Sequence, residues 1–273
     1  MLLIAVFLYW RLNPAAAAPG FTLSRFLILD AILFFAGFMS GMIGFAFSAI
    51  GAAILLLIQP LVGVPLLQAL SAANQMLSVG QLRDEMPKSW RDWWPYGPGP
   101  CIVGGLVGVP VGVWLLNNLP AKTLTLIFGV LIGLYAVYSV FKPAEPKLQE
   151  CNGAKSGLLV GAIGGSIGGF TAFPGAAVFV WTSIRSLPKA QMRAILQPYI
   201  LVLQLVSLAT NAALHPHNFG SRFWTLLLLT IPVVLPGTMS GVSTYRGVSE
   251  VTFRRVCYLL LLVSGAGLIA KAF

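Results

Sequence analysis

A glycine-dense run, Gly161-Ala-Ile-Gly-Gly-Ser-Ile-Gly-Gly-Phe-Thr-Ala-Phe-Pro-Gly-Ala-Ala177, interrupts an otherwise apolar segment of the sequence. An earlier run, Gly37-Phe-Met-Ser-Gly-Met-Ile-Gly-Phe-Ala-Phe-Ser-Ala-Ile-Gly-Ala-Ala53, repeats it at an offset of 124 residues (161 − 37). This offset sets Gly44 opposite Gly168 and Phe45 opposite Gly169. We interpret the two runs as copies of one device, a broken membrane helix that exposes backbone polar groups to a solute.

Composition places the chain among membrane proteins. Hydrophobic residues make up 58% of the 273 residues and charged residues only 9%, whereas an ordinary soluble domain has about 25% charged residues. Apolar runs of about 20 residues, the length that crosses a bilayer, recur along the chain. We therefore predict an all-α polytopic membrane protein. Its apolar segments are 25–58, 61–82, 96–117, 121–141, 155–182, 190–213, 222–245 and 250–273.

The four later segments repeat the four earlier ones. In the third pair, Leu106-Val-Gly-Val-Pro-Val-Gly-Val113 matches Leu235-Pro-Gly-Thr-Met-Ser-Gly-Val242 at an offset of 129 (237 − 108). Both copies contain Gly-x-x-x-Gly, a spacing that allows two helices to approach closely. The predicted organisation is an apolar, interfacial segment over 1–24, a first transmembrane repeat over 25–148 and a second over 149–273. Each repeat is a broken or re-entrant glycine-rich helix followed by three transmembrane helices.

The two glycine-rich segments have unusual lengths. As single helices, 25–58 would be about 51 Å long and 155–182 about 42 Å, too long for one crossing and too short for two. A hairpin that dips into the membrane and returns fits both lengths, and so do two short crossings. If each segment returns, the two repeats are inverted relative to each other.

The positive-inside rule tests this topology. With two hairpins, twelve of the 17 Lys and Arg residues face one side, and five face the other: Arg11, Arg25, Lys122, Arg222 and Lys271. With two single crossings the division is ten to seven. Splitting only the second segment gives fourteen to three, but it treats two matching sequences differently. The hairpin model therefore remains the preferred one.

The helices that follow the two breaks carry the densest set of uncharged polar residues. Such side chains are costly against lipid, so we expect them to point inward. There they either hydrogen-bond between helices or donate N–H groups to the oxygens of an anion. Basic Arg83 and Arg193 lie at the ends of these helices, which the inverted model places at the cytoplasmic mouth. The predicted substrate-binding residues are Gly44, Ser48, Asn74, Gln75, Arg83, Gly168, Gly169, Thr171, Arg193, Gln197 and Gln204.

Other chemistry is poorly supported. Gly164-Gly-Ser-Ile-Gly168 matches the Gly-x-Ser-x-Gly pattern of serine hydrolases, but such a match arises easily by chance in a glycine-rich run. A hydrolase would also need a His base facing Ser166, and His215 and His217 lie in a proline-containing loop. Cys101, Cys151 and Cys257 form neither a CxxC pair nor a Cys/His cluster, so no metal site or disulfide framework is predicted. We therefore expect no catalysis and no cofactor. We also expect no nucleic-acid partner, because most of the basic residues behind the net charge of +10 flank apolar spans.

The paired glycine-rich segments and the paired Gly-x-x-x-Gly segments resemble the TauE/SafE sulfite exporter family of bacterial membrane proteins, over residues 27–270. The positions that carry the resemblance are Gly37, Gly41, Gly44, Gly161, Gly165, Gly168 and Pro174. The resemblance implies transport, usually export, of sulfite or an organosulfonate anion such as sulfoacetate. It also implies a multi-pass protein of the bacterial inner membrane, in contact with lipid.

The leading hypothesis is thus an anion transporter whose site lies near the bilayer midplane, between two helix breaks. Half-helix N-termini present free N–H groups and the positive end of the helix dipole, which suits a negative solute. The alternative is a membrane partner or assembly protein that transports nothing. The sequence leaves the choice of anion, the ion coupling and the oligomeric state, monomer or homodimer, open.

Overall fold

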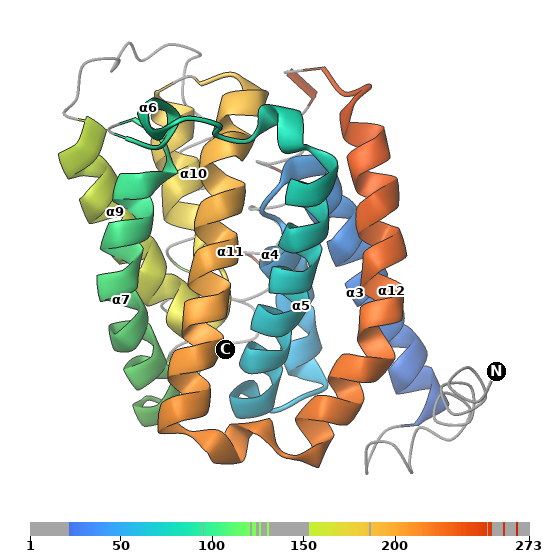
Figure 1. Cartoon of the computed structure of the whole chain (residues 1–273). Coiled ribbons are helices and arrows are strands. Elements are labelled where there is room, and N and C mark those ends of the chain that lie inside the picture. Colours follow the sequence, from blue (N-terminus) through green and yellow to red (C-terminus); the bar gives the residue numbers. More distant parts are fainter. Residues whose placement is uncertain are drawn as a thin grey trace.

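The computed structural model describes residues 22–94, 96–120, 153–185 and 187–249, with isolated positions in 122–130 and 251–266. These residues form helices and no strands (Figure 1). In chain order the elements are α3 (Leu23–Ile43), α4 (Phe47–Gly51), η1 (Ala52–Leu56), α5 (Pro60–Gln81), η2 (Arg83–Glu85), α6 (Trp90–Trp93), α7 (Pro98–Asn118), α9 (Gly153–Thr171), α10 (Gly175–Ile184), α11 (Lys189–Leu214), η3 (Pro216–Phe219) and α12 (Ser221–Tyr245).

The all-helical class is confirmed for the described residues, and four helices are long and apolar enough to cross a membrane: α3, α7, α11 and α12. Segments 61–82, 96–117, 190–213 and 222–245 agree with α5, α7, α11 and α12 to within two residues. The long segments 25–58 and 155–182 each contain more than one helix. The predicted segments 121–141 and 250–273, and almost all of 1–24, lie outside the described residues.

Close glycine contacts join the two halves of the chain. A Cβ on Gly108 of α7 would lie 2.1 Å from the Ala162 carbonyl oxygen of α9, and a Cβ on Gly112 would lie 2.1 Å from that of Ser166. In the other pair, a Cβ on Gly241 of α12 would lie 1.9 Å from the Phe38 carbonyl oxygen of α3. Only glycine permits such backbone contact. Each first helix thus packs against the third helix of the opposite half.

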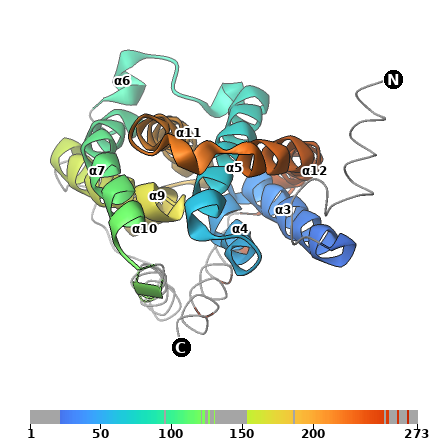
Figure 2. The same cartoon turned by 90° about the horizontal axis from the view of Figure 1, so that it is seen from below.

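The direction of these contacts makes both pairs parallel, since contact positions increase together along α7 and α9 and along α3 and α12. Seen from below, α5 and α11 lie between the two pairs (Figure 2). In Figure 1, α3 and α5 both begin at the lower end of the bundle, whereas α9 and α11 both begin at the upper end. The chain therefore turns back inside the bundle between the start of α3 and the start of α5. It does so again between the start of α9 and the start of α11.

The turning points are two residues with left-handed backbone. Gly44 (φ 98°) ends α3, and Ala172 (φ 61°) follows α9. Their separation is 128 residues (172 − 44), and the starts of α4 and α10 have the same separation (175 − 47). The predicted offset of 124 is therefore wrong by one helical turn, and Gly168 lies inside α9 rather than at a break. Because glycine recurs every four residues here, both offsets align Gly37 and Gly41 with glycines of the second run.

Candidate functional site

The two breaks meet at the centre of the bundle through the residues that follow them. The ring of Phe45 stacks on Phe173, with centroids 6.1 Å apart and planes 11° apart, and on Phe179 at 4.3 Å. A Cβ on Gly175, the first residue of α10, would lie 3.2 Å from the Phe45 Cβ. At the corrected offset Phe45 corresponds to Phe173, so the two breaks contact each other through equivalent side chains.

An amide from the following helix caps each break. The Gln75 Nε2 of α5 donates to the carbonyl oxygen of Gly44 at 2.7 Å. The Gln204 Nε2 of α11 donates to the carbonyl oxygen of Ala172 at 2.7 Å. Both glutamines are 1% exposed. A helix that ends inside the bundle leaves carbonyl groups without partners, and these amides supply them with donors.

A second amide reaches each break from the opposite half. The Gln68 Nε2 donates to the carbonyl oxygens of Gly168 and Gly169, both at 3.3 Å. Gln197 lies at the first break, where a Cβ on Gly44 would be 3.5 Å from its Nε2. Each break is thus surrounded by one glutamine from each half.

These amides also show a pattern that the sequence reasoning missed. Gln68 and Gln197, Gln75 and Gln204, and Ser78 and Ser207 are each separated by 129 residues (197 − 68, 204 − 75, 207 − 78). This is the offset that the Gly-x-x-x-Gly pair already displayed. Applying it to the polar residues would have identified Gln68, which the predicted site omitted.

Arg193 is the cation of this centre. Its side chain is 0% exposed, and its Nη1 donates to the carbonyl oxygens of Gly41 and Met42, at 2.9 and 2.8 Å. Its guanidinium carbon lies 4.2 Å from the centre of the Tyr245 ring. The expectation that Arg193 lies at an open mouth is therefore wrong. The early end of α3 leaves carbonyl oxygens inside the bundle, and a guanidinium satisfies two of them at the negative end of the helix dipole.

Of the remaining predicted residues, Asn74 and Thr171 have structural partners. Asn74 Nδ2 donates to Ser40 Oγ at 2.7 Å and its Oδ1 accepts from Thr238 Oγ1 at 2.8 Å, which ties α5 to α3 and α12. The Thr171 hydroxyl accepts from the backbone N–H of Phe173 at 3.1 Å and so shapes the second break.

The other predicted residues are placed as follows. Gly168 packs against Pro174, since a Cβ there would lie 2.6 Å from the Pro174 Cβ, and Gly169 packs against Gly112. Ser48 is buried in α4, next to the first break. Arg83 lies exposed in η2, away from the buried centre.

Ser166 does not have the surroundings of a nucleophile. Its hydroxyl donates to the carbonyl oxygens of Ala162 and Gly108, at 3.0 and 3.2 Å, in the α7–α9 contact. His215 and His217 lie at η3, beyond the end of α11, in contact with each other. No group of three His, Cys, Asp or Glu residues in the described part of the chain could hold a metal ion.

The centre therefore offers a set of unpaired amide atoms and one cation. Among the described residues, Gln197 Nε2 and Oε1 meet no hydrogen-bond partner, nor do the Oε1 atoms of Gln68, Gln75 and Gln204. All four glutamines are at most 1% exposed. Unsatisfied polar atoms of this kind are costly in a protein interior, so a polar occupant would stabilise them.

One of three comparisons with known proteins finds a match. The family model described as "Sulfite exporter TauE/SafE" matches residues 29–268. No curated protein and no solved structure matches the chain. The match spans both breaks, both glycine-paired helix contacts and all four glutamines. It confirms the family resemblance that the glycine-rich segments carried.

Proposed function

The chain belongs to the TauE/SafE sulfite exporter family, and from this premise we propose that it carries sulfite or a small organosulfonate, such as sulfoacetate, through the centre of the bundle. The family is described as one of sulfite exporters, and the apolar helices fit a multi-pass membrane protein. The main observation in support of this site concerns Gln197. It is a fully buried amide at the first break, and its polar atoms have no hydrogen-bond partner among the described residues.

The two halves act as inverted repeats, each starting with a re-entrant hairpin. In support, α7 and α9 run parallel, as do α3 and α12, and each half supplies one glutamine to each break. The starts of α3 and α9 lie at opposite ends of the bundle (Figure 1). Inverted repeats with interrupted helices are a recurring transporter plan, with the solute site between the repeats. Non-helical backbone at this depth requires a protein or aqueous environment, which the central position supplies.

The proposed anion site lies between Arg193, Gln197 and the start of α10. The Gln197 amide offers N–H donors, and the first N–H groups of α10 have no intrahelical partner and form the positive end of its dipole. Arg193 contributes a positive charge near the first break. The amide oxygens of Gln68, Gln75 and Gln204 are acceptors, which suit a proton-bearing anion such as hydrogensulfite.

Export from a bacterial cell across its inner membrane needs no separate energy source under this proposal. A monovalent anion that leaves a cell with a negative interior gains about 2.3 kcal/mol per 100 mV. No carboxylate is among the residues of the proposed site, so an acid relay is not required. Because these residues are buried, the helices must part at one end of the bundle before the solute reaches them.

Efflux from proteoliposomes tests the proposal. Purified protein is reconstituted with internal sulfite under a negative internal potential, and external sulfite is measured over time. We expect faster efflux than from protein-free liposomes, and Gln197→Leu should slow it at least about tenfold, because a donor to a charged group contributes about 1.5–3 kcal/mol. Gln81→Leu, at the end of α5, is the matched control and should retain the wild-type rate.

Two results would contradict the proposal in different ways. Unchanged efflux by Gln197→Leu would leave transport intact but remove this site. The absence of flux for sulfite, sulfoacetate, taurine, sulfate and acetate alike, together with a stable protein complex after mild extraction, would favour the non-transporting partner protein instead.

A further inference from the structure

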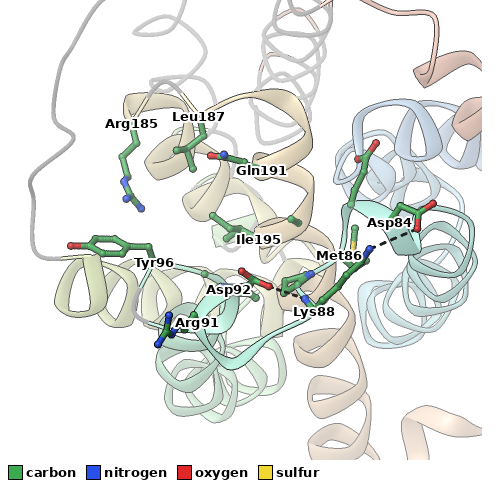
Figure 3. A pocket seen from close by; sticks show the side chains of 15 residues that line it. Asp84, Met86, Lys88, Arg91, Asp92, Tyr96, Arg185, Leu187, Gln191 and Ile195 are labelled. Carbon is green, nitrogen blue, oxygen red and sulfur yellow. Dashed lines mark hydrogen bonds and ion pairs between the residues drawn. The ribbon is translucent and has the colours of Figure 1, made fainter.

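A cavity of about 480 Å³ lies at the upper end of the bundle, apart from the buried glutamines. Its walls come from the connector between α5 and α7 and from the turn between α10 and α11. Figure 3 shows Arg185 and Tyr96 on one side of it and Asp84 on the other, with Gln191 and Ile195 between them. The volume is in the range of sites for small organic molecules and exceeds what a bare sulfite ion needs.

The acidic residues of this cavity are already engaged by the protein. Asp84 lies 3.9 Å from the Lys88 ammonium group, and Glu85 accepts a hydrogen bond from the Tyr245 hydroxyl at 3.0 Å. Asp92 accepts from the backbone N–H groups of Ser89 and Lys88, at 2.9 and 3.1 Å. Bonds from the backbone and side chain of Ser89, and then from the Lys88 backbone, lower the pKa of Asp92. Each carboxylate thus has a partner within the chain.

The cation opposite them has unused donor capacity. The Arg185 guanidinium carbon lies 4.5 Å from the centre of the Trp181 ring and 5.4 Å from that of Tyr96. Its Nη1 is buried and meets no hydrogen-bond partner among the described residues. Stacking holds the plane of a guanidinium and leaves its N–H edge available for a planar or bidentate oxyanion. The group without a partner in the wall of this cavity is therefore a donor.

The wall also contains an apolar part, which determines the kind of anion. Met86, Leu187 and Ile195 line the cavity together with prolines of the connector. Apolar lining with a few placed polar groups is typical of sites for organic ligands. We propose that the cavity is a second binding site, for an organosulfonate whose anionic head lies on Arg185 and whose carbon chain lies on Leu187 and Ile195.

This site lies on the route toward the central one, and in that respect it rests on the proposed transport function. Glu85, in the cavity wall, is bonded to Tyr245, and the Tyr245 ring lies under Arg193, which in turn contacts the end of α3. Ala194 and Ile195 of the wall are the next residues after Arg193 on α11. The wall of the cavity is thereby connected to the first break through Tyr245 and Arg193.

Equilibrium binding tests the site independently of transport. Ethanesulfonate is titrated into purified protein by calorimetry, with sulfite as the second probe. We expect Arg185→Met, which keeps an apolar stem over Trp181, to weaken ethanesulfonate binding at least about tenfold, and sulfite binding much less. Ala194→Phe, which fills the cavity and leaves Arg185 in place, should have the same effect. Arg246→Met, an exposed cation outside the lining of the cavity, is the control and should bind as the wild type.

Flux measurements then separate this site from the proposed function. With Arg185→Met, the ethanesulfonate concentration at half-maximal flux should rise while the maximal rate stays unchanged. Wild-type binding by both Arg185→Met and Ala194→Phe would overturn the second site even if flux is robust. Equal weakening of sulfite and ethanesulfonate would overturn its assignment to an organic anion. Arg185-dependent binding without any flux would keep the site and refute transport.

Discussion

The polar side chains of the bundle interior have two distinct roles. The Asn74 amide is hydrogen-bonded to Ser40 and Thr238, so it joins three helices. Gln197, by contrast, has neither polar atom paired among the described residues. Residue type and helical face cannot separate these roles, because both residues are buried amides on helices that follow a break. The difference lies in whether a neighbouring helix presents a matching hydroxyl.

Thr238→Val tests the structural role of Asn74. Valine keeps the shape of threonine but removes the donor to Asn74 Oδ1, so we expect a loss of about 1–2 kcal/mol in stability. The thermal unfolding midpoint in detergent should fall, while the affinity for sulfite should stay unchanged. Ser243→Ala removes an exposed hydroxyl of the same helix that bonds only within it, and it should leave the midpoint unchanged. A weaker affinity with an unchanged midpoint would mean that Asn74 faces the solute.

The burial of Arg193 could not be predicted from its residue type and its position in the sequence. A basic residue near the end of a predicted span ordinarily extends toward the headgroups. Here it is completely buried because α3 ends inside the bundle and leaves the carbonyl oxygens of Gly41 and Met42 as acceptors. These acceptors meet Arg193 only in the folded protein, since Gly41 and Arg193 are 152 residues apart in the sequence.

The elements themselves follow closely from the sequence. Pro60 and Pro98 occupy the first helical positions of α5 and α7, where a missing N–H costs nothing. The glycine-rich segments indicated their own interruption, because each is too long for one span. The register of the second interruption could not be predicted. Glycines at 161, 165 and 169 repeat every four residues, so a shift of one turn still aligns Gly37 and Gly41 with glycines, and the positive φ of Ala172 fixes the position.

The paired helices give a sharp test at the level of elements. In Gly108→Ala, the new Cβ would lie 2.1 Å from the Ala162 carbonyl oxygen, so α7 and α9 must separate. We expect a loss of about 1–3 kcal/mol in stability, as for overpacking elsewhere. Gly80→Ala in α5 is the matched control, because nothing lies within 4 Å of the added Cβ, and alanine there should be neutral or stabilising by up to about 1 kcal/mol. Both variants are compared by thermal unfolding; equal midpoints would contradict the close contact of α7 with α9.

At the scale of the whole molecule, the exchange of helices between halves links the two breaks mechanically. The pair of α7 with α9 and the pair of α3 with α12 each contain one helix from either half, and α5 and α11 lie between them. Gln68 and Arg193 cross from one half to the break of the other. Rotation of one pair against the other would therefore change the surroundings of both breaks together. That coupling is what a carrier with a single central site requires.

The distribution of basic residues over the two ends predicts the orientation of the bundle. The connector after α5, which contains Lys88 and Arg91, and the α10–α11 turn, which contains Arg185 and Lys189, are at the upper end in Figure 1. The lower end carries Arg25, at the start of α3, and Arg222, at the start of α12. Loops rich in Lys and Arg stay on the cytoplasmic side, so the upper end should face the cytoplasm.

Cysteine labelling in a cysteine-free background checks this orientation and the hairpins at the same time. Lys88→Cys should react with a membrane-impermeant maleimide only after the cells are opened, whereas Arg222→Cys should react on intact cells. Ser24→Cys, at the start of α3, and Gln59→Cys, between η1 and α5, discriminate between the topologies, because a returning first segment leaves both positions on the same side and a single crossing puts them on opposite sides. Labelling of Ser24→Cys and Gln59→Cys from opposite sides of the membrane would exclude the hairpin and, with it, the inverted relation of the two halves on which the central anion site depends.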